Sequence, residues 1–426
     1  MTDRSRESGS RRLLGELLAA SHLMPLEMLP AAVAEHAAPA GIGQVLIYLV
    51  DVRRQVLRQL TTSGAAGPEG GKPEGGKPEE LKVEGTVPGR AYQYGEVLPA
   101  APAEPGRHQW WVPLLNGTER MGLLRVTTAT DDARAREDMK LLSALVALLV
   151  VSKRDFSDAF ARLVGSEAMT IAAEMQWRLM PQTTYADGRV AISAVMEPAY
   201  DISGDAYDYA TDGPMVRLAV FDAMGHDTAA GLTANLALGA CRNARRRRAD
   251  LVRTGERIDE ALIEQFQGGR YATGILAELD TRGGELRWVS YGHHPPLVIR
   301  GGRWTSQLRC PPGLPLGMGL GPGLEATLCR EQLQPGDRIV FYTDGITEAR
   351  RPGGREFGLT RFVDFLIRQH ADGLPVPETL RRLVGAVMAH HEGHLQDDAT
   401  VLLCEWLGPV PGPTVQAAAL MGVPSL

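Results

Sequence analysis

The chain has 426 residues, of which 44% are hydrophobic and 23% charged, and its formal net charge is -6. This length exceeds what one ordinary hydrophobic core takes up, so we expect two domains. The slightly acidic balance excludes the basic surface that general nucleic-acid binding requires.

The first 152 residues predict helices at both ends and strands between them. Leucines at helical spacing indicate helix over residues 10–34, with breaks at Pro25 and Pro30. The sequence Glu-Gly-Gly-Lys-Pro occurs twice between residues 62 and 80, and this Gly- and Pro-rich insert has little to bury, so we expect a mobile loop. Apolar patterns predict a helix at 138–152 and strands at 44–50, 56–60, 109–115 and 121–127.

This N-terminal pattern, including Val112-Pro113-Leu114 and Gly122-Leu123-Leu124, resembles a GAF-type sensor domain. The resemblance implies a smaller α/β domain over residues 10–152 that receives a small-molecule or protein signal. A small α/β domain that binds nothing is the alternative. Residues 153–184 follow as a helical linker, because 155–179 has a helical pattern, and this helix could also join two copies of the chain in a homodimer.

The C-terminal half predicts many strands and blocks of helices, which indicates a layered α+β domain over residues 185–408. Repeated Pro and Gly after it predict a flexible tail at 409–426. The expected helices are 228–248, 257–267, 359–369 and 377–391, and the expected strands are 190–195, 215–221, 272–279, 286–291, 297–300, 338–342 and 400–405.

The four cysteines form no Cys-x-x-Cys pair, which argues against a disulfide framework or a zinc knuckle. The most apolar stretch, 141–151, is about half the length that a bilayer requires. We therefore expect a cytoplasmic protein without a membrane partner.

Four acidic motifs of the C-terminal half have a common design, in which an aspartate lies beside small residues at the end or the start of a strand. A single such aspartate is usually a turn residue or a helix cap. Four in one domain predict an all-oxygen site for Mg²⁺ or Mn²⁺, where two ions can activate a shared water against a phosphate ester. The motifs are Gly204-Asp205, Asp222-Ala223-Met224-Gly225, Asp344-Gly345 and Asp397-Asp398.

Residues 191–406 resemble the SpoIIE-like branch of the metal-dependent (PPM) serine/threonine phosphatases, bacterial regulators of partner switching. Five motifs in order carry the resemblance: Ser203-Gly204-Asp205-Ala206-Tyr207-Asp208, Asp222-Ala223-Met224-Gly225-His226, Tyr291-Gly292-His293-His294-Pro295-Pro296, Tyr342-Thr343-Asp344-Gly345-Ile346-Thr347-Glu348-Ala349 and Asp397-Asp398-Ala399-Thr400.

The resemblance implies an αββα sandwich of two antiparallel sheets with two metal ions, Mn²⁺ or Mg²⁺, between them. Asp222 would bridge both ions. Asp205 and the backbone carbonyl of Ala223 would bind the first ion, and Asp344 and Asp397 the second. These four aspartates would form the catalytic centre.

The implied reaction is hydrolysis of phosphoserine or phosphothreonine on a regulatory protein, by analogy an anti-sigma-factor antagonist. A pseudophosphatase that only binds its partner and a hydrolase of small phosphate esters are the alternatives. The family often has Gly where this chain has Ala223 and Asp227, and Asp227 would add negative charge near the ions. His293 and His294 are expected to shape a loop between strands, with a role near the phosphate as the alternative. The run Arg245 to Arg248, with Arg242, is expected to be a solvated face or to dock an acidic partner. The histidines at 390, 391 and 394 lie at a predicted helix end, where histidine interacts favourably with the helix dipole. They are therefore not expected to bind metal.

Overall fold

The computed structural model describes residues 3–62, 79–101, 106–165, 167–197, 200–201, 204–319, 326–349, 354, 356–372, 374–391, 395, 397–411 and 414–423. The insert that we expect to be mobile therefore lies almost wholly outside the described residues. The chain divides into two compact units, one up to Glu167 and one from Ala168 to Met421, and each is described by itself. In the described part of the chain, no helix combines the length and the apolar character that crossing a membrane requires.

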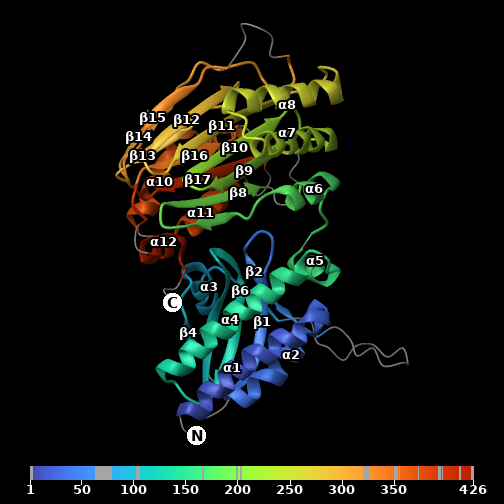
Figure 1. Ribbon diagram of the computed structural model, residues 1–426, viewed down its shortest axis with the longest axis vertical. Coiled ribbons are helices and arrows are strands. Elements are labelled where there is room, and N and C mark those ends of the chain that lie inside the picture. The colour runs from blue at the N-terminus through green and yellow to red at the C-terminus, as the bar shows by residue number, and fades with distance from the viewer. Residues whose placement is uncertain are drawn as a thin grey trace, which may run out of the picture. The chain divides into compact units, whose positions relative to one another are not determined.

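The N-terminal unit is an α/β domain built on one antiparallel sheet of order β3-β2-β1-β6-β5-β4 (Figure 1). Helices α1 (Asp3–Ala20), α2 (Leu29–Ala37) and α4 (Ala133–Arg154) pack on one face through a continuous apolar cluster, and α3 (Val87–Tyr94) covers the other face. The strands are β1 (Ile42–Val50), β2 (Val56–Leu60), β3 (Glu80–Lys82), β4 (Leu98–Ala100), β5 (His108–Asn116) and β6 (Glu119–Thr128).

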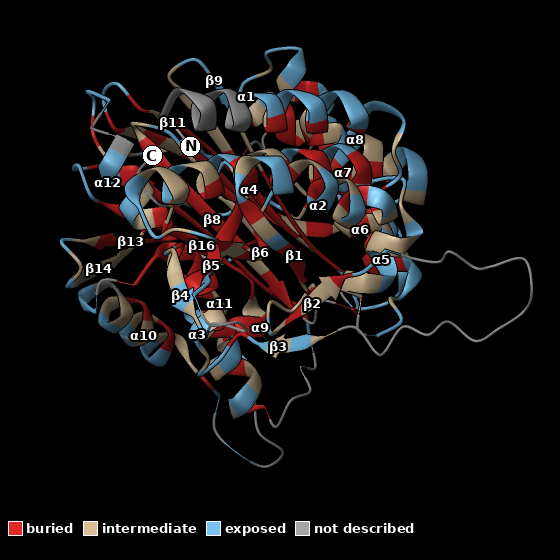
Figure 2. Ribbon diagram, turned by 90° about the horizontal axis from the view of Figure 1, so that it is seen from below, coloured by how far each residue is buried: buried red, intermediate tan, exposed pale blue. Residues whose placement is uncertain are grey.

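The C-terminal unit is a sandwich of two antiparallel sheets, which confirms the predicted αββα fold (Figure 1). The first sheet has the order β15-β12-β11-β10-β9 and the second the order β14-β13-β16-β17-β8-β7. Apolar side chains from both sheets, among them Ile192, Val220 and Phe341, fill the space between them and are buried (Figure 2). Helices α7 (Thr228–Arg246) and α8 (Leu251–Phe266) cover the outer face of the first sheet, and α10 (Leu359–Ala371) and α11 (Val376–His390) that of the second.

The strands of the sandwich mostly extend the predicted ranges by one or two residues, because apolar runs mark strand interiors better than strand ends. β9 follows a turn and was not predicted. The strands are β7 (Thr184–Ala186), β8 (Val190–Glu197), β9 (Asp205–Asp212), β10 (Met215–Ala223), β11 (Ala272–Asp280), β12 (Glu285–Tyr291), β13 (Leu297–Arg300), β14 (Trp304–Gln307), β15 (Cys329–Gln332), β16 (Arg338–Tyr342) and β17 (Ala399–Trp406).

The linker is not one helix. The helical pattern over 155–179 folds as α5 (Asp158–Val164) and α6 (Ile171–Leu179). Each helix has its own N-cap: the Ser157 hydroxyl accepts from the Phe160 N–H, and the Thr170 hydroxyl accepts from the Ala173 N–H. A side-chain cap starts a new helix. The helical spacing of apolar residues therefore continues along the sequence, although the helical backbone is interrupted between α5 and α6.

Two further expectations are wrong. The tail predicted to be flexible contains α12 (Thr414–Met421), which buries Ala417 and Met421. Cys310 and Cys329, which the sequence analysis left unpaired, form a disulfide with a Cα–Cα distance of 5.9 Å. Cys310 follows β14 and Cys329 begins β15, so two residues 19 apart in sequence meet.

Candidate metal centre

The predicted aspartates meet at one edge of the sandwich, with contributions from both sheets. On the first sheet, Asp222 of β10 pairs in register with Asp205 of β9. On the second, Asp344 begins the short helix α9 (Asp344–Thr347) directly after β16, and Asp397 lies just before β17, the neighbour of β16. The two sheets are joined here, because the backbone N–H of Gly204 donates to the Asp398 carboxylate over 2.6 Å.

The carboxylates lie close enough to raise one another's pKa. Burial, and then the charges of Asp344, Asp397 and Asp398, raise the pKa of Asp222 to about 7. Burial, followed by the charges of Asp222 and Asp398, raises the pKa of Asp205 well above its usual range. The pKa of Asp344 is also raised, by burial and then by Asp397 and Glu348. Such mutual repulsion between oxygen donors is what a divalent cation relieves, so the donor set fits Mg²⁺ or Mn²⁺.

The adjacent aspartates 397 and 398 differ in their surroundings. Asp397 is exposed at the edge of the sandwich, and one of its oxygens accepts from the N–H of Asp398 over 2.9 Å. Asp398 is buried, and its Oδ2 accepts from the N–H groups of Gly204 (2.6 Å) and Asp205 (3.2 Å). Asp398 therefore fixes the start of β9, while the side chain of Asp397 is exposed to solvent.

Small residues allow these segments to approach one another. A Cβ at position 204 would lie 2.9 Å from the carbonyl oxygen of Ala223, and a Cβ at position 345 would lie 2.0 Å from that of Asp398. The Thr343 hydroxyl donates to Asp205 Oδ2 over 2.7 Å and so fixes one oxygen of that carboxylate from the opposite sheet. The Ala223 carbonyl, which the resemblance assigns to the first ion, thus lies beside the segment that carries Asp205.

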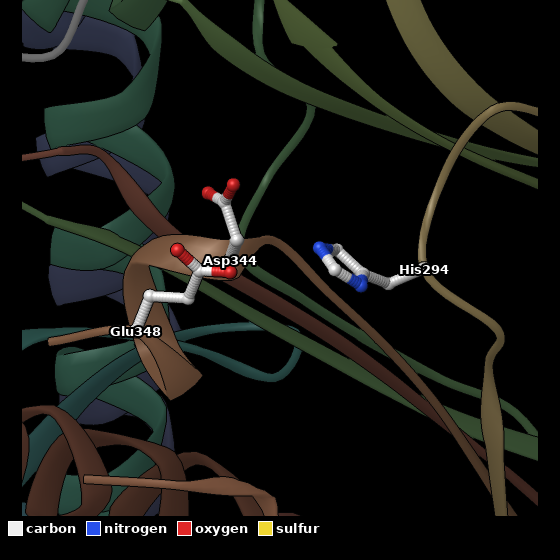
Figure 3. A group of neighbouring side chains, drawn as sticks. All are labelled: His294, Asp344 and Glu348. Carbon is white, nitrogen blue, oxygen red and sulfur yellow. The ribbon is translucent and has the colours of Figure 1, made fainter. Parts of the chain in front are cut away.

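A second group at this edge consists of His294, Asp344 and Glu348, whose ligand atoms lie within 4.8 Å of one another (Figure 3). Such a group could hold a metal ion. From the sequence, His294 is expected to shape a loop, with a role near the phosphate as the alternative, and Glu348 has no assigned role. The spacing contained a signal, because Glu348 follows Asp344 by four residues and so lies one helical turn away.

The residues discounted or left open in the sequence have other partners. Asp227 caps α7 by accepting from the Ala230 N–H (2.8 Å), and it pairs with Arg270 (3.0 Å). Its charge is therefore compensated beside the site.

Arg242 and Arg245 pair with the buried Asp208, which excludes them from a free docking face. Among the histidines near the end of α11, His390 contacts Arg361 and His391 is buried, and His394 lies outside the described residues.

Comparison with known proteins finds a family model that matches most of this unit. Residues 212–407 match the family described as Stage II sporulation protein E (SpoIIE). The phosphoserine phosphatase RsbU of Bacillus subtilis is 22% identical over 233 residues, which cover 55% of this chain and 68% of RsbU. Protein IcfG of Synechocystis sp. is 23% identical over 145 residues, which cover 34% of this chain and only 22% of IcfG.

Among solved structures, the RsbU and RsbW domains of Rv1364c from Mycobacterium tuberculosis align with 25% identity and a TM-score of 0.46, over 54% of this chain and 63% of that one. The family match covers most of the sandwich and includes four of the five motifs that the sequence analysis recognised. Over residues 212–407, the C-terminal unit of this chain is therefore similar to the SpoIIE family of phosphatase domains.

Proposed function

We propose that this protein is a metal-dependent phosphatase that hydrolyses phosphoserine or phosphothreonine on a regulatory partner protein, of the anti-sigma-factor antagonist type. The observation that carries the proposal is the meeting of carboxylates from both sheets at one edge, where burial and repulsion raise the pKa of Asp205, Asp222 and Asp344. The similarity to RsbU, a named phosphoserine phosphatase, supports the substrate class.

In this proposal two ions would be held by these oxygens, with Asp222 shared between them. Asp205 and the carbonyl of Ala223 would hold one ion, and Asp344 and Asp397 would hold the other. When bound, Mn²⁺ or Mg²⁺ lowers the pKa of a water and neutralises charge on the phosphate. The protein supplies the arrangement of the ligand oxygens. Because metal binding and protonation compete for these carboxylates, a bound cation keeps them charged at neutral pH.

The N-terminal unit, in the same proposal, is a GAF-like sensor that receives a small molecule or a protein signal. Support comes from its single antiparallel sheet with helices on both faces. Its signal reaches the phosphatase unit through the linker, where two copies of the chain could also associate.

The test is a phosphatase assay on p-nitrophenyl phosphate, phosphoserine and phosphothreonine peptides, and a set of small phosphate esters. Each is measured with Mn²⁺, with Mg²⁺ and with a chelator, and Asp222→Asn is the matched inactive variant. We expect metal-dependent turnover of the phosphopeptides that the variant lacks. No turnover with either metal would leave a partner-binding pseudophosphatase, and turnover of small esters alone would leave a metabolite hydrolase.

A further inference from the structure

His293 lies where the chain passes from one sheet of the sandwich to the other. Strand β12 of the first sheet ends at Tyr291, and strand β13 of the second sheet begins at Leu297. The segment 292–296 between them therefore crosses the edge that carries the aspartates. Of this segment's two histidines, His294 is exposed, whereas His293 has only 7% of its surface exposed. The proposed metal chemistry makes no use of this buried imidazole.

Both ring nitrogens of His293 have partners, and the partners determine its tautomer. Nε2 lies 3.1 Å from the backbone carbonyl oxygen of Tyr342, which can only accept, so Nε2 carries the hydrogen. Nδ1 lies 2.8 Å from the Thr273 hydroxyl, which then donates to it. Burial, and secondly the neighbouring His294, lower the pKa of His293 to about 4, so the ring is neutral at pH 7.

The two partners belong to different sheets, and each is adjacent to a proposed ligand. Thr273 of β11 is the register partner of Asp222 on β10. Tyr342 ends β16, two residues before Asp344. The imidazole of His293 therefore connects β11, which pairs with the strand of Asp222, to β16, which leads into Asp344.

We propose that His293 is a positioning residue that sets the distance between Asp222 and Asp344 by joining Thr273 to Tyr342 across the two sheets. The inference rests on the proposed function only in that these aspartates bind Mn²⁺. A divalent ion tolerates little change in the spacing of its oxygen ligands, and partners outside the ligand set typically change metal affinity by about 10- to 100-fold. A histidine that only fills the core would affect stability without this effect on metal affinity.

The test measures Mn²⁺ binding to the full chain by calorimetry and by the electron paramagnetic resonance of the free ion, together with the melting temperature in chelator. His293→Leu fills much of the volume without either hydrogen bond, and Thr273→Val removes one bond with little change in shape. His293→Gln retains a donor for Tyr342 and an acceptor for Thr273. We expect the dissociation constant for Mn²⁺ to rise about 10-fold or more in His293→Leu, less in Thr273→Val, and least in His293→Gln.

Trp406→Phe is the matched control, because the Trp406 Nε1–H of the second sheet donates to the Thr281 carbonyl beyond β11 over 2.9 Å. This bond also joins the two sheets, but it lies at the end of β11 away from Thr273. We expect Trp406→Phe to lower the melting temperature while Mn²⁺ affinity stays within about twofold of wild type.

The inference would be overturned by Mn²⁺ affinity that is unchanged in both Thr273→Val and His293→Gln. This holds whether His293→Leu also has unchanged affinity or fails to fold. A wild-type protein that binds no Mn²⁺ would overturn it together with the metal assignment. If Mn²⁺ affinity changes as expected but no phosphate ester is hydrolysed, the positioning role of His293 stands and the proposed activity fails.

Discussion

Asp222 faces three other carboxylates, and burial together with their charges raises its pKa to about 7. The pKa of an aspartate in an unfolded chain is near 3.9, so the folded protein binds this proton more tightly than the unfolded chain does. Without metal, Asp222 therefore lowers the free energy of unfolding progressively as the pH rises from about 4 through about 7. The same carboxylate that the proposed chemistry requires destabilises the metal-free fold at neutral pH.

Asp222→Asn removes this charge, so in chelator the variant should melt at least about 2 °C above wild type at pH 7.5, and the difference should shrink towards pH 5. With saturating Mn²⁺ the order should reverse, while kcat should fall by at least about 10³, or ~4 kcal/mol of transition-state stabilisation. Melting curves across pH, with and without Mn²⁺, measure this. A metal-free wild type that is more stable than the variant at pH 7.5 would show that Asp222 is not in a repulsive cluster.

Asp397 and Asp398 should respond differently to replacement by alanine. The sequence assigned metal binding to Asp397 and no role to Asp398, but two backbone N–H groups at the start of β9 donate to the buried Asp398 carboxylate. Leaving buried donors unpaired costs about 1–3 kcal/mol each, so Asp398→Ala should lower the melting temperature markedly. Asp397→Ala should leave the melting temperature of the metal-free protein nearly unchanged and weaken Mn²⁺ binding. Equal melting temperatures for the two variants in chelator would contradict this division of roles.

Helix α6 is the element through which the N-terminal unit could act on the site. The Gln176 side chain is fully buried and donates to the backbone carbonyl of Asp205 over 2.7 Å. Further along the neighbouring helix α7, the ion pairs of Arg242 and Arg245 with Asp208 hold its C-terminal half against β9. The start of α7 is held as well, because its cap Asp227 pairs with Arg270. We therefore expect α6 to affect metal affinity through the contact of Gln176 with Asp205.

Gln176→Leu should raise the Mn²⁺ concentration for half-maximal activity more than it lowers the saturated rate, because it releases the backbone of a proposed ligand. Met175→Pro should do the same more strongly, since it breaks α6. Ala172→Pro would be a weak test, because Ala172 lies in the first turn after the Thr170 cap, where proline is tolerated. Arg178→Ala, at an exposed position of the same helix, is the control. Metal titrations that superimpose for Gln176→Leu and Arg178→Ala would exclude this route.

At the scale of the whole molecule, the C-terminal unit begins at Ala168 rather than at the predicted residue 185. A fragment of residues 168–423 keeps α6 and α12, so we expect it to fold and to bind Mn²⁺. A fragment that begins at Tyr185 lacks Gln176 and exposes the surface that Ala172 and Ala173 cover. It should therefore bind Mn²⁺ more weakly and melt lower. Identical Mn²⁺ titrations of the two fragments would show that α6 contributes nothing to the site.

The sequence by itself determined a layered α+β domain and the positions of its aspartates along the chain, and the resemblance to a known family implied the sandwich. Apolar strands are local patterns, and the predicted ranges of β13 and β16 match the observed ones. Asp205, Asp222, Asp344 and Asp397 could be named because an acidic residue beside small residues, at the end or the start of a strand, is also a local pattern.

Only the tertiary structure decided which groups those aspartates meet. Gly204 and Asp398 are 194 residues apart, and the imidazole of His293 reaches a carbonyl 49 residues away. The Cys310–Cys329 disulfide, the Asp208 ion pairs and the docking of α12 depend on contacts of the same kind. A pattern of neighbouring residues reports which face of an element is buried, but the partner on that face comes from a distant segment and is chosen by packing.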